Sequence, residues 1–168
     1  VYVSEEVFAL EMDRIFGSAW IYVGHDSQIP EPGDYWTTRI GLESVVMARG
    51  KQDEINVFYN RCPHKGARIA GDGCGRTIGL FRCPYHAWTF NLDGTLRGVP
   101  YLEGYENTRF DMADPRFSLQ KVARVASYRG FVFASLSESA VNFDSFIACI
   151  KSSLDYFCDR APNGTVSV

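Results

Sequence analysis

The spacing of hydrophobic positions changes twice along this chain, and each change predicts a different kind of element. Near the N-terminus, four apolar residues recur at helical spacing: Phe8, Met12, Ile15 and Phe16. This spacing predicts a short amphipathic helix, interpreted as an arm that packs against the rest of the fold, with a partner-binding helix as the alternative. Ser4 can cap its first turn, and Gly17 can end it. We therefore expect a helical arm over residues 1–19.

Between residues 20 and 136 the pattern shifts to short apolar runs separated by turn residues, which indicates β-strands joined by tight hairpins. The expected strands are 21–23, 35–40, 45–49, 55–59, 78–82, 88–91, 121–128 and 131–136. Residues 99–118 follow no period and predict an irregular loop that wraps the core or contacts a neighbouring domain. The prediction for 20–136 is a mainly antiparallel β core.

Helical spacing returns near the C-terminus. Six apolar residues follow it: Phe143, Phe146, Ile147, Ile150, Leu154 and Phe157. We expect a helix within residues 141–159 whose apolar stripe packs in the core, or against a part of the protein that this chain does not contain. The fold class predicted from the whole pattern is mainly β with one helix at each end.

Composition narrows the class of protein. A length of 168 residues fits a single domain with a real core. The net charge of −3 argues against a nucleic-acid or anionic-membrane partner, and no apolar run could span a bilayer. The acidic first twenty residues predict neither a secretory signal nor a transit peptide. The chain begins with Val1, so we expect that some N-terminal residues are missing.

The five cysteines are an odd number. Cys149 and Cys158 fall on one expected helix about 13 Å apart, too far for a disulfide. We expect both to be free buried thiols in a reducing cytoplasm.

The strongest chemical signal is a pair of mixed motifs, Cys62-Pro63-His64 and Cys83-Pro84-Tyr85-His86. Two thiolates and two imidazoles are the ligand set of a Rieske [2Fe–2S] cluster, in which two histidines replace two cysteines at one iron. Each proline stiffens its loop. We therefore expect loops 60–68 and 81–90 to hold the cluster through Cys62, His64, Cys83 and His86.

A structural zinc ion is the main alternative for these four residues, because zinc also accepts two cysteines and two histidines. Common zinc fingers place both cysteines in one knuckle and both histidines in another, whereas each motif here is mixed. The mixed motifs favour the iron–sulfur cluster. Metal analysis would separate the two.

The stretches 60–68, Asn-Arg-Cys-Pro-His-Lys-Gly-Ala-Arg, and 82–90, Arg-Cys-Pro-Tyr-His-Ala-Trp-Thr-Phe, resemble the Rieske domain of aromatic-ring-hydroxylating oxygenases. The flanking segments 16–25, 29–35, 91–96 and 130–133 extend the resemblance to nearly the whole chain, as the N-terminal part of the α subunit. It implies a Rieske fold over 1–168, with Cys62 and Cys83 on one iron and His64 and His86 on the other.

The resemblance also implies partners and a missing part. Ring-hydroxylating dioxygenases are oxidoreductases fed from NAD(P)H by a reductase, with or without a ferredoxin, and they form α3 or α3β3 oligomers. Their mononuclear non-haem Fe(II), held by two histidines and a carboxylate, lies in a catalytic domain further along the chain. His25 is the only histidine outside the two motifs, so we expect no catalytic residue in this chain. The fragment alone should only transfer electrons.

A free-standing Rieske ferredoxin is the alternative function, although such carriers lack the two terminal helices. The cysteines that form a disulfide in respiratory Rieske proteins are replaced by Ala67 and Tyr85, which implies a potential near the low end of a range from about −150 to +300 mV. The aromatic substrate, and the choice between mono- and dioxygenation, cannot be read from this sequence.

Several single residues carry weaker signals. We expect His25 to be a surface or hydrogen-bonded loop histidine, and Cys74 to be an inert loop thiol. Trp88 is interpreted as a packed aromatic that shields the cluster, with a specific role at a docking surface as the alternative. Tyr85 fits either a core position or a contact with the cluster. Lys65 and Arg68 fit either solvated loop charges or a surface that steers an acidic redox partner.

Overall fold

The computed structural model describes residues 3–168, so positions 1–2 of the predicted arm lie outside the described residues. Contacts within the chain divide it into two compact units. The first comprises Val1–Gln28, Arg39–Glu43 and Val122–Val168, and the second comprises Ile29–Thr38 and Ser44–Lys121. The prediction of a single region over 1–168 stays a prediction. Among residues 3–168, no helix has the length and apolar character to cross a membrane.

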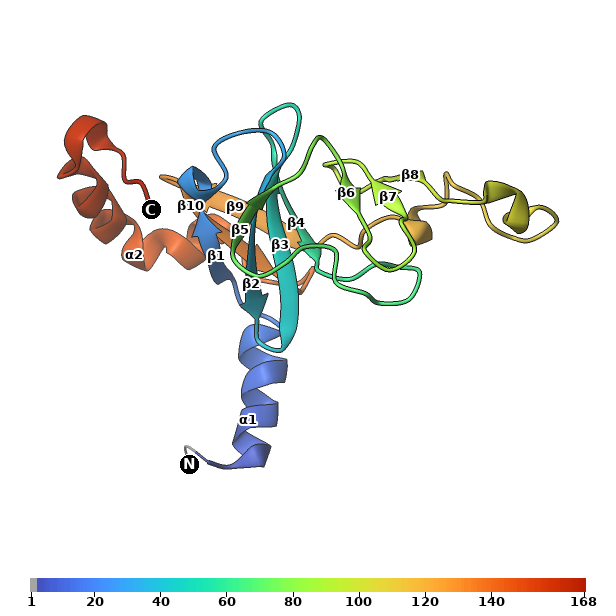
Figure 1. Cartoon of the computed structure of the whole chain (residues 1–168). Helices are drawn as coiled ribbons and strands as arrows, with labels where there is room; N and C mark the ends of the chain where they lie inside the picture. The colour runs from blue at the N-terminus through green and yellow to red at the C-terminus, as the bar shows by residue number, and fades with distance from the viewer. Residues whose placement is uncertain (1–2) are drawn as a thin grey trace. The chain divides into compact units, whose positions relative to one another are not determined.

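The first unit contains both long helices and one three-stranded antiparallel sheet (Figure 1). The sheet runs in the order β1 (Ile21–His25), β10 (Phe131–Ser135) and β9 (Arg124–Tyr128). α2 (Phe143–Asp159) begins within the predicted range and is capped by Asn142, whose side chain accepts hydrogen bonds from the first-turn amides. Its apolar stripe packs with Trp20 and Phe133 around the buried Ile147. The predicted C-terminal helix is therefore confirmed, but only part of its stripe faces the core, since Ile150 and Phe157 are exposed.

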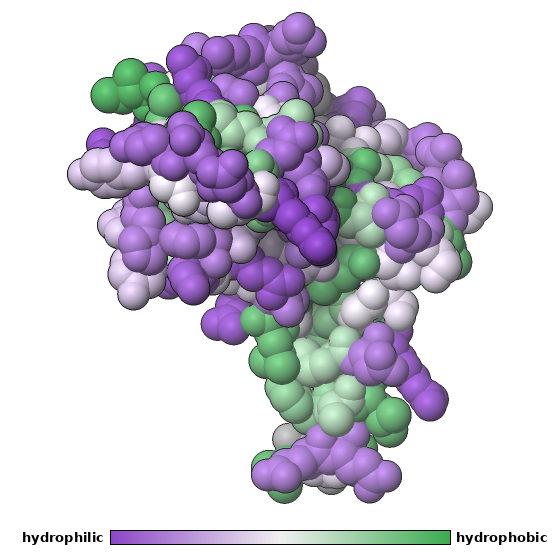
Figure 2. Space-filling view, turned by 90° about the vertical axis from the view of Figure 1, so that its right-hand side faces the viewer, coloured by the Kyte–Doolittle hydropathy of each residue, from purple (hydrophilic) through white to green (hydrophobic). Residues whose placement is uncertain are grey.

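The N-terminal arm is also helical, but it buries little. α1 (Glu5–Glu11) is capped by Ser4, whose hydroxyl accepts from the Val7 amide at 3.4 Å, and the chain continues as a π-helical turn η1 (Met12–Phe16) up to Gly17. No residue of α1 or η1 is buried. The apolar side chains of this arm are visible as the green region in the lower part of Figure 2. Within the first unit, the arm packs at its end, where Phe16 and Met12 lie against Gly41.

The second unit contains most of the sheet β4–β3–β2–β5 and all of the small sheet β6–β7–β8. The bounds are β2 (Asp34–Ile40), β3 (Glu43–Arg49), β4 (Ile55–Tyr59), β5 (Cys74–Arg76), β6 (Phe81–Arg82), β7 (Thr89–Phe90) and β8 (Leu96–Gly98). The strand pairs β1–β10, β10–β9, β2–β5, β3–β4, β6–β7 and β7–β8 are all antiparallel, so the mainly antiparallel prediction is confirmed.

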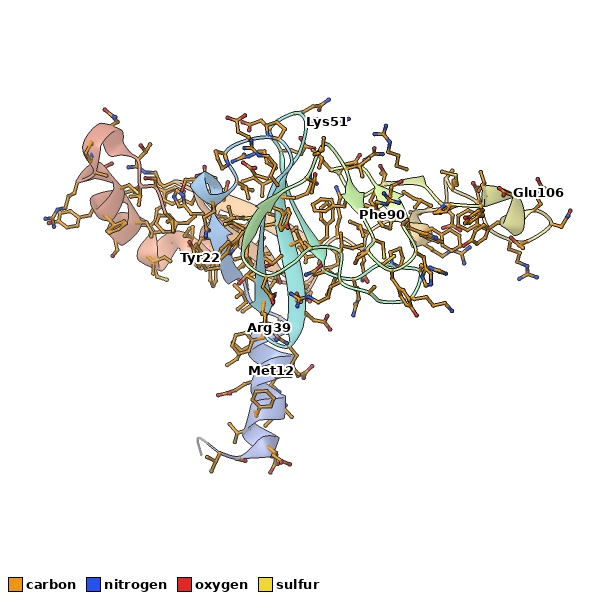
Figure 3. The ribbon with its side chains drawn as sticks, viewed as in Figure 1. Met12, Tyr22, Arg39, Lys51, Phe90 and Glu106 are labelled. Carbon is orange, nitrogen blue, oxygen red and sulfur yellow. The ribbon has the colours of Figure 1, made fainter. Side chains whose placement is uncertain are left out.

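One core holds the second unit together. Its centre is aromatic and aliphatic, with Phe58 and Phe90 almost completely buried, and both motif cysteines belong to it. Figure 3 labels Phe90, which belongs to the small sheet, among the side chains of this unit. Four positive charges lie on the ligand loops outside this core, so the loops present sulfur inward and charge outward.

Four predicted strands are shorter than expected. Those predicted over 88–91 and 131–136 lose only one or two residues at their ends, and the other two lose three. The strand predicted over 78–82 is only Phe81–Arg82, because Ile78 is fully exposed and therefore has no packing partner to hold it in a sheet. The strand predicted over 121–128 begins at Arg124, and Lys121 makes only an isolated bridge with Phe58. Two short strands, β5 and β8, were not predicted. The irregular loop is confirmed: residues 99–118 contain only the 3-10 turns η3 (Leu102–Tyr105) and η4 (Pro115–Phe117).

Candidate metal centre

Both ligand loops close in the same way, although their sequences differ in length between cysteine and histidine. In the first loop, the Cys62 amide donates to the Ala67 carbonyl and the Gly66 amide donates to the Cys62 carbonyl, each at 2.8 Å. These two bonds join residues five and four apart. They force a tight turn that aims the residues between them at one point.

The second loop repeats this pattern. The Cys83 amide donates to the Trp88 carbonyl at 2.8 Å, and the Ala87 amide donates to the Cys83 carbonyl at 3.0 Å. The position four residues after each cysteine has a positive φ, +74° at Gly66 and +58° at Ala87. Glycine adopts this conformation freely, whereas alanine is strained there. The strained Ala87 shows that the loop geometry prevails over the local preference of the residue.

The Asn60 side chain holds the first ligand loop in place through four hydrogen bonds. Its side-chain oxygen accepts from the amides of Ile69 and Ala70 at 2.9 and 3.0 Å, and its amide group donates to the Ala70 carbonyl at 3.0 Å and to the Ser44 hydroxyl at 3.3 Å. The side chain is buried, so each of these bonds replaces one to water. Asn60 thus ties the end of the loop to its beginning.

The two sulfur atoms lie together in the core. Cys62 and Cys83 are both 2% exposed. Burial raises the pKa of the Cys62 thiol to about 11, the backbone amides of His64 and Lys65 lower it, and the neighbouring Cys83 thiol raises it further. A thiolate in this place needs a cation or hydrogen-bond donors to offset its burial. The two amides directed at the sulfur are suited to a metal-bound thiolate.

The two imidazoles also lie together, on the side nearer the solvent. The ring centroids of His64 and His86 are 4.7 Å apart, and His64 is half-buried whereas His86 is exposed. Nδ1 of His64 is buried and has no hydrogen-bond partner. Burial lowers the pKa of His64, and the charges of His86 and Lys65 lower it too, so the neutral form that binds metal is favoured.

An aromatic ring supports each imidazole. Trp88 stacks on His64, with centroids 4.8 Å apart and planes within 3°, and Tyr85 stacks on His86 at 3.9 Å. Trp88 is buried among rings of loop 99–118, which confirms the prediction of a packed aromatic. Tyr85 is 66% exposed, so it is not a core residue.

The residues present fit a cluster whose two irons have different protein ligands. Two buried sulfurs form one side, two imidazoles form the other, and an unpartnered nitrogen of His64 remains for a metal. A Rieske cluster takes two protein ligands at each iron. Within residues 3–168, no three His, Cys, Asp or Glu side chains are arranged around a single ion.

The other residues predicted from the sequence lie elsewhere. His25 belongs to the first unit and is buried at the end of β1, with Nδ1 3.0 Å from the Ser27 hydroxyl, so it is hydrogen-bonded but not on the surface. Cys74 is exposed and free, on β5. Cys158 is buried as expected, but Cys149 is exposed, which corrects the prediction of two buried thiols. Its position on α2 faces away from the apolar stripe.

Two residues near the centre were missed by sequence reasoning. No pattern distinguishes Asn60 from any other polar residue before a cysteine, so its four bonds were unpredictable. Arg82 could have been noticed as a cation next to Cys83. It lines a surface depression of about 560 Å³ together with His64 and His86.

Comparison with known proteins agrees with this geometry. The family described as Rieske [2Fe-2S] domain matches residues 19–127. The benzene 1,2-dioxygenase subunit alpha of Pseudomonas putida is 36% identical over 165 residues, covering 98% of this chain and 36% of that protein. This chain thus spans little more than a third of that relative's length.

Solved structures give the same result. Naphthalene 1,2-dioxygenase from Rhodococcus superposes with a TM-score of 0.87 at 34% identity, covering 95% of this chain and 36% of that one. A quaternary ammonium Rieske monooxygenase, for which inter-subunit electron transfer has been described, superposes with a TM-score of 0.82 at 36% identity, covering 94% and 41%. The chain belongs to the Rieske [2Fe-2S] domain family. Its cofactor is therefore a [2Fe–2S] cluster, and its relatives are α subunits of oxygenases.

Proposed function

We propose that Cys62, His64, Cys83 and His86 hold this cluster, with the cysteines at one iron and the histidines at the other. The observation that carries the proposal is the separation of ligand types within one site: two sulfurs in the core, and two adjacent imidazoles towards the solvent. When bound, the cluster supplies one-electron transfer. The chain's own residues bury its sulfur side, orient the two rings by stacking, and leave the imidazole side accessible.

We further propose that the chain is the Rieske domain of the α subunit of a ring-hydroxylating oxygenase. It receives electrons from an NAD(P)H-dependent reductase, directly or through a ferredoxin, for use at a mononuclear iron elsewhere in an α3 or α3β3 assembly. Its similarity to oxygenase α subunits across both terminal helices supports this role over a free-standing ferredoxin. The three cysteines outside the ligand set, Cys74, Cys149 and Cys158, form no disulfide, which favours a cytoplasmic location.

Ligand variants test the assignment. His64→Ala and His86→Ala should each abolish the visible absorption of the cluster and lower the bound iron from about two per chain to near zero. Cys74→Ser is the matched control, because Cys74 lies between the loops but is exposed and outside the set. A normal spectrum in either histidine variant, or iron loss in the Cys74 variant, would refute the ligand set.

Iron counting in the protein made from the full-length transcript tests the proposed class. An oxygenase α subunit should bind about three irons per chain, two in the cluster and one at a mononuclear site. A free-standing carrier binds about two. Zinc in place of iron would exclude both functions and would support a structural metal site.

A further inference from the structure

A buried histidine in the first unit takes no part in the proposed metal centre. His25 is 2% exposed and stands at the end of β1. Its ring meets the Phe131 ring edge-on at 5.0 Å, and its Nε2 edge occupies the space that a side chain at Gly130 would need. Within residues 3–168, this Nε2 atom is buried and has no hydrogen-bond partner. The hydrogen bonds of the ring are therefore made through Nδ1.

Nδ1 of His25 faces donors on one side and an acceptor on the other. The Ser27 hydroxyl lies 3.0 Å from Nδ1, and the Ser27 amide donates to it at 3.3 Å. A carboxylate oxygen of Asp26 lies 3.1 Å from the same atom. A neutral ring with its proton on Nε2 accepts from both Ser27 groups, whereas a proton on Nδ1 is directed at Asp26 and opposes the Ser27 amide. The ring thus has two arrangements that differ by one proton.

The Ser27 hydroxyl also holds the C-terminal segment, residues 161–168. The chain turns back after α2 (Figure 1), and the Val168 amide donates to Ser27 Oγ at 3.0 Å. A hydroxyl has one proton and two lone pairs, so Ser27 can donate to the His25 ring and accept from Val168 at the same time. The protonation of His25 is in this way connected to the position of the C-terminal segment.

The charges around the ring decide which group receives its second proton. The β9–β10 turn contributes Arg129, which pairs with Asp159 and lies 4.0 Å from Asp155, so its charge is offset by carboxylates of α2. β10 contributes an uncharged aromatic ring, and the C-terminal segment contains no titratable side chain. Asp26, on the turn that follows β1, is therefore the charged group that stabilises a proton on Nδ1 of His25.

We propose that His25, Asp26 and Ser27 form a proton-controlled latch for the C-terminal segment. With His25 neutral, Ser27 donates to the ring and holds the Val168 amide. With His25 protonated, Nδ1–H donates to Asp26, the Ser27 amide faces a second donor, and Ser27 moves away from Val168. In the proposed oxygenase the chain continues past this segment, so the latch controls how firmly the first unit holds that connection. This last step alone rests on the proposed function.

A second contact makes the release local. Arg129 donates to the Gly164 carbonyl at 3.2 Å, and this bond does not involve the His25 ring. Protonation of the latch should therefore release residues 165–168 and leave the turn η5 (Pro162–Gly164) in place. Acid unfolding of the whole unit would expose both parts together, so the two processes can be distinguished.

Hydrogen–deuterium exchange of the cluster-loaded full-length protein measures this release. Each exchange rate is divided by the intrinsic rate at the same pH, and fragmentation in the mass spectrometer resolves the Val168 amide from residues 160–164. Between about pH 8 and pH 5, where histidines change charge, protection of the Val168 amide should fall about two- to tenfold, as expected for the loss of one hydrogen bond. Protection of residues 160–164 should stay constant.

Variants of the latch separate its parts. His25→Asn keeps an acceptor near the place of Nδ1 but takes up no proton, so protection of Val168 should stay at its high-pH value throughout. Ser27→Ala has no hydroxyl to accept from Val168 and should show low protection at every pH. Asp26→Asn should move the release to lower pH, because the cation loses its carboxylate. Ser167→Ala, at an exposed serine of the same segment, is the matched control and should respond like the unmodified protein.

The outcomes keep the latch apart from the proposed function. Protection of Val168 that does not change with pH, an unaltered pH response in His25→Asn, or an equal loss over residues 160–164 would each overturn the latch. If His25→Asn does not fold, Ser27→Ala and Asp26→Asn decide, and a normal pH response in both overturns it. Cluster absorption is recorded on the same samples, and its absence refutes the proposed function without affecting the latch.

Discussion

Trp88→Ala should be one of the most damaging single substitutions in the second unit. The indole is 3% exposed, stacks on His64 at 4.8 Å, and meets the rings of Phe110 and Phe117 edge-on at 5.7 and 6.2 Å. Truncating a buried tryptophan to alanine costs about 3–5 kcal/mol, because the lost burial is joined by the cost of a cavity. The whole free energy of unfolding of a typical domain is only about 5–15 kcal/mol.

Urea unfolding followed by circular dichroism and by cluster absorption measures this loss. With a urea dependence of about 2 kcal/mol per molar, the midpoint should fall by about 2 M. Both signals should fall together, since the same ring supports the core and the imidazole.

Two matched variants sharpen the test. Trp88→Phe keeps a ring against His64, so its urea midpoint should fall much less than that of the alanine variant. Tyr85→Ala removes the other stacked ring. Because Tyr85 is 66% exposed, the urea midpoint of this variant should change little. An unchanged midpoint for Trp88→Ala, or an equal loss for Tyr85→Ala, would refute the idea that burial rather than stacking sets the stability of this site.

Three further results are expected. Asn60→Ala should speed hydrogen exchange of the loop amides that its side chain binds and should cost about 1–3 kcal/mol in urea unfolding; unchanged exchange would contradict its positioning role. Ala87→Gly should raise the urea midpoint or leave it unchanged, by relief of about 1 kcal/mol of left-handed strain, and a clear loss would contradict that strain. The Arg76 hydrogen bond lowers the pKa of Asp34, so the pair stabilises the fold above about pH 4 and this contribution is lost as the pH falls further. Asp34→Asn should therefore cost about 0.5–1 kcal/mol at pH 7, and the difference from the unmodified protein should shrink below about pH 4; a constant difference would argue against the ion pair.

Local signals in the sequence were sufficient for most of the fold. Ser4 was expected to cap the first helix, an interaction that depends only on neighbouring amides, and this cap is present. β5 was missed because Gly75 has no strand preference. It is held in place by pairing with Tyr35, whose hydroxyl occupies the space that a larger side chain at Gly75 would need, and Tyr35 is forty residues away in the chain. Long-range pairing of this kind leaves no trace in a local pattern.

The candidate site could be predicted to the level of its four ligand candidates and no further. The two motifs name the residues, but the separation of sulfur from imidazole depends on how two distant loops meet. The burial of Trp88 was expected from its type, whereas its parallel stacking on His64 required the second loop to be placed against the first. Cys149 was misjudged because the helical stripe leaves it on the open face of α2.

The depth of the two sulfurs ties metal binding to stability. In the proposed ligand set, Cys62 and Cys83 belong to the same apolar core that stabilises the folded unit. Cluster binding and core packing then depend on the same two side chains, so removal of the cluster should lower the free energy of unfolding of this unit as well as abolish its electron transfer.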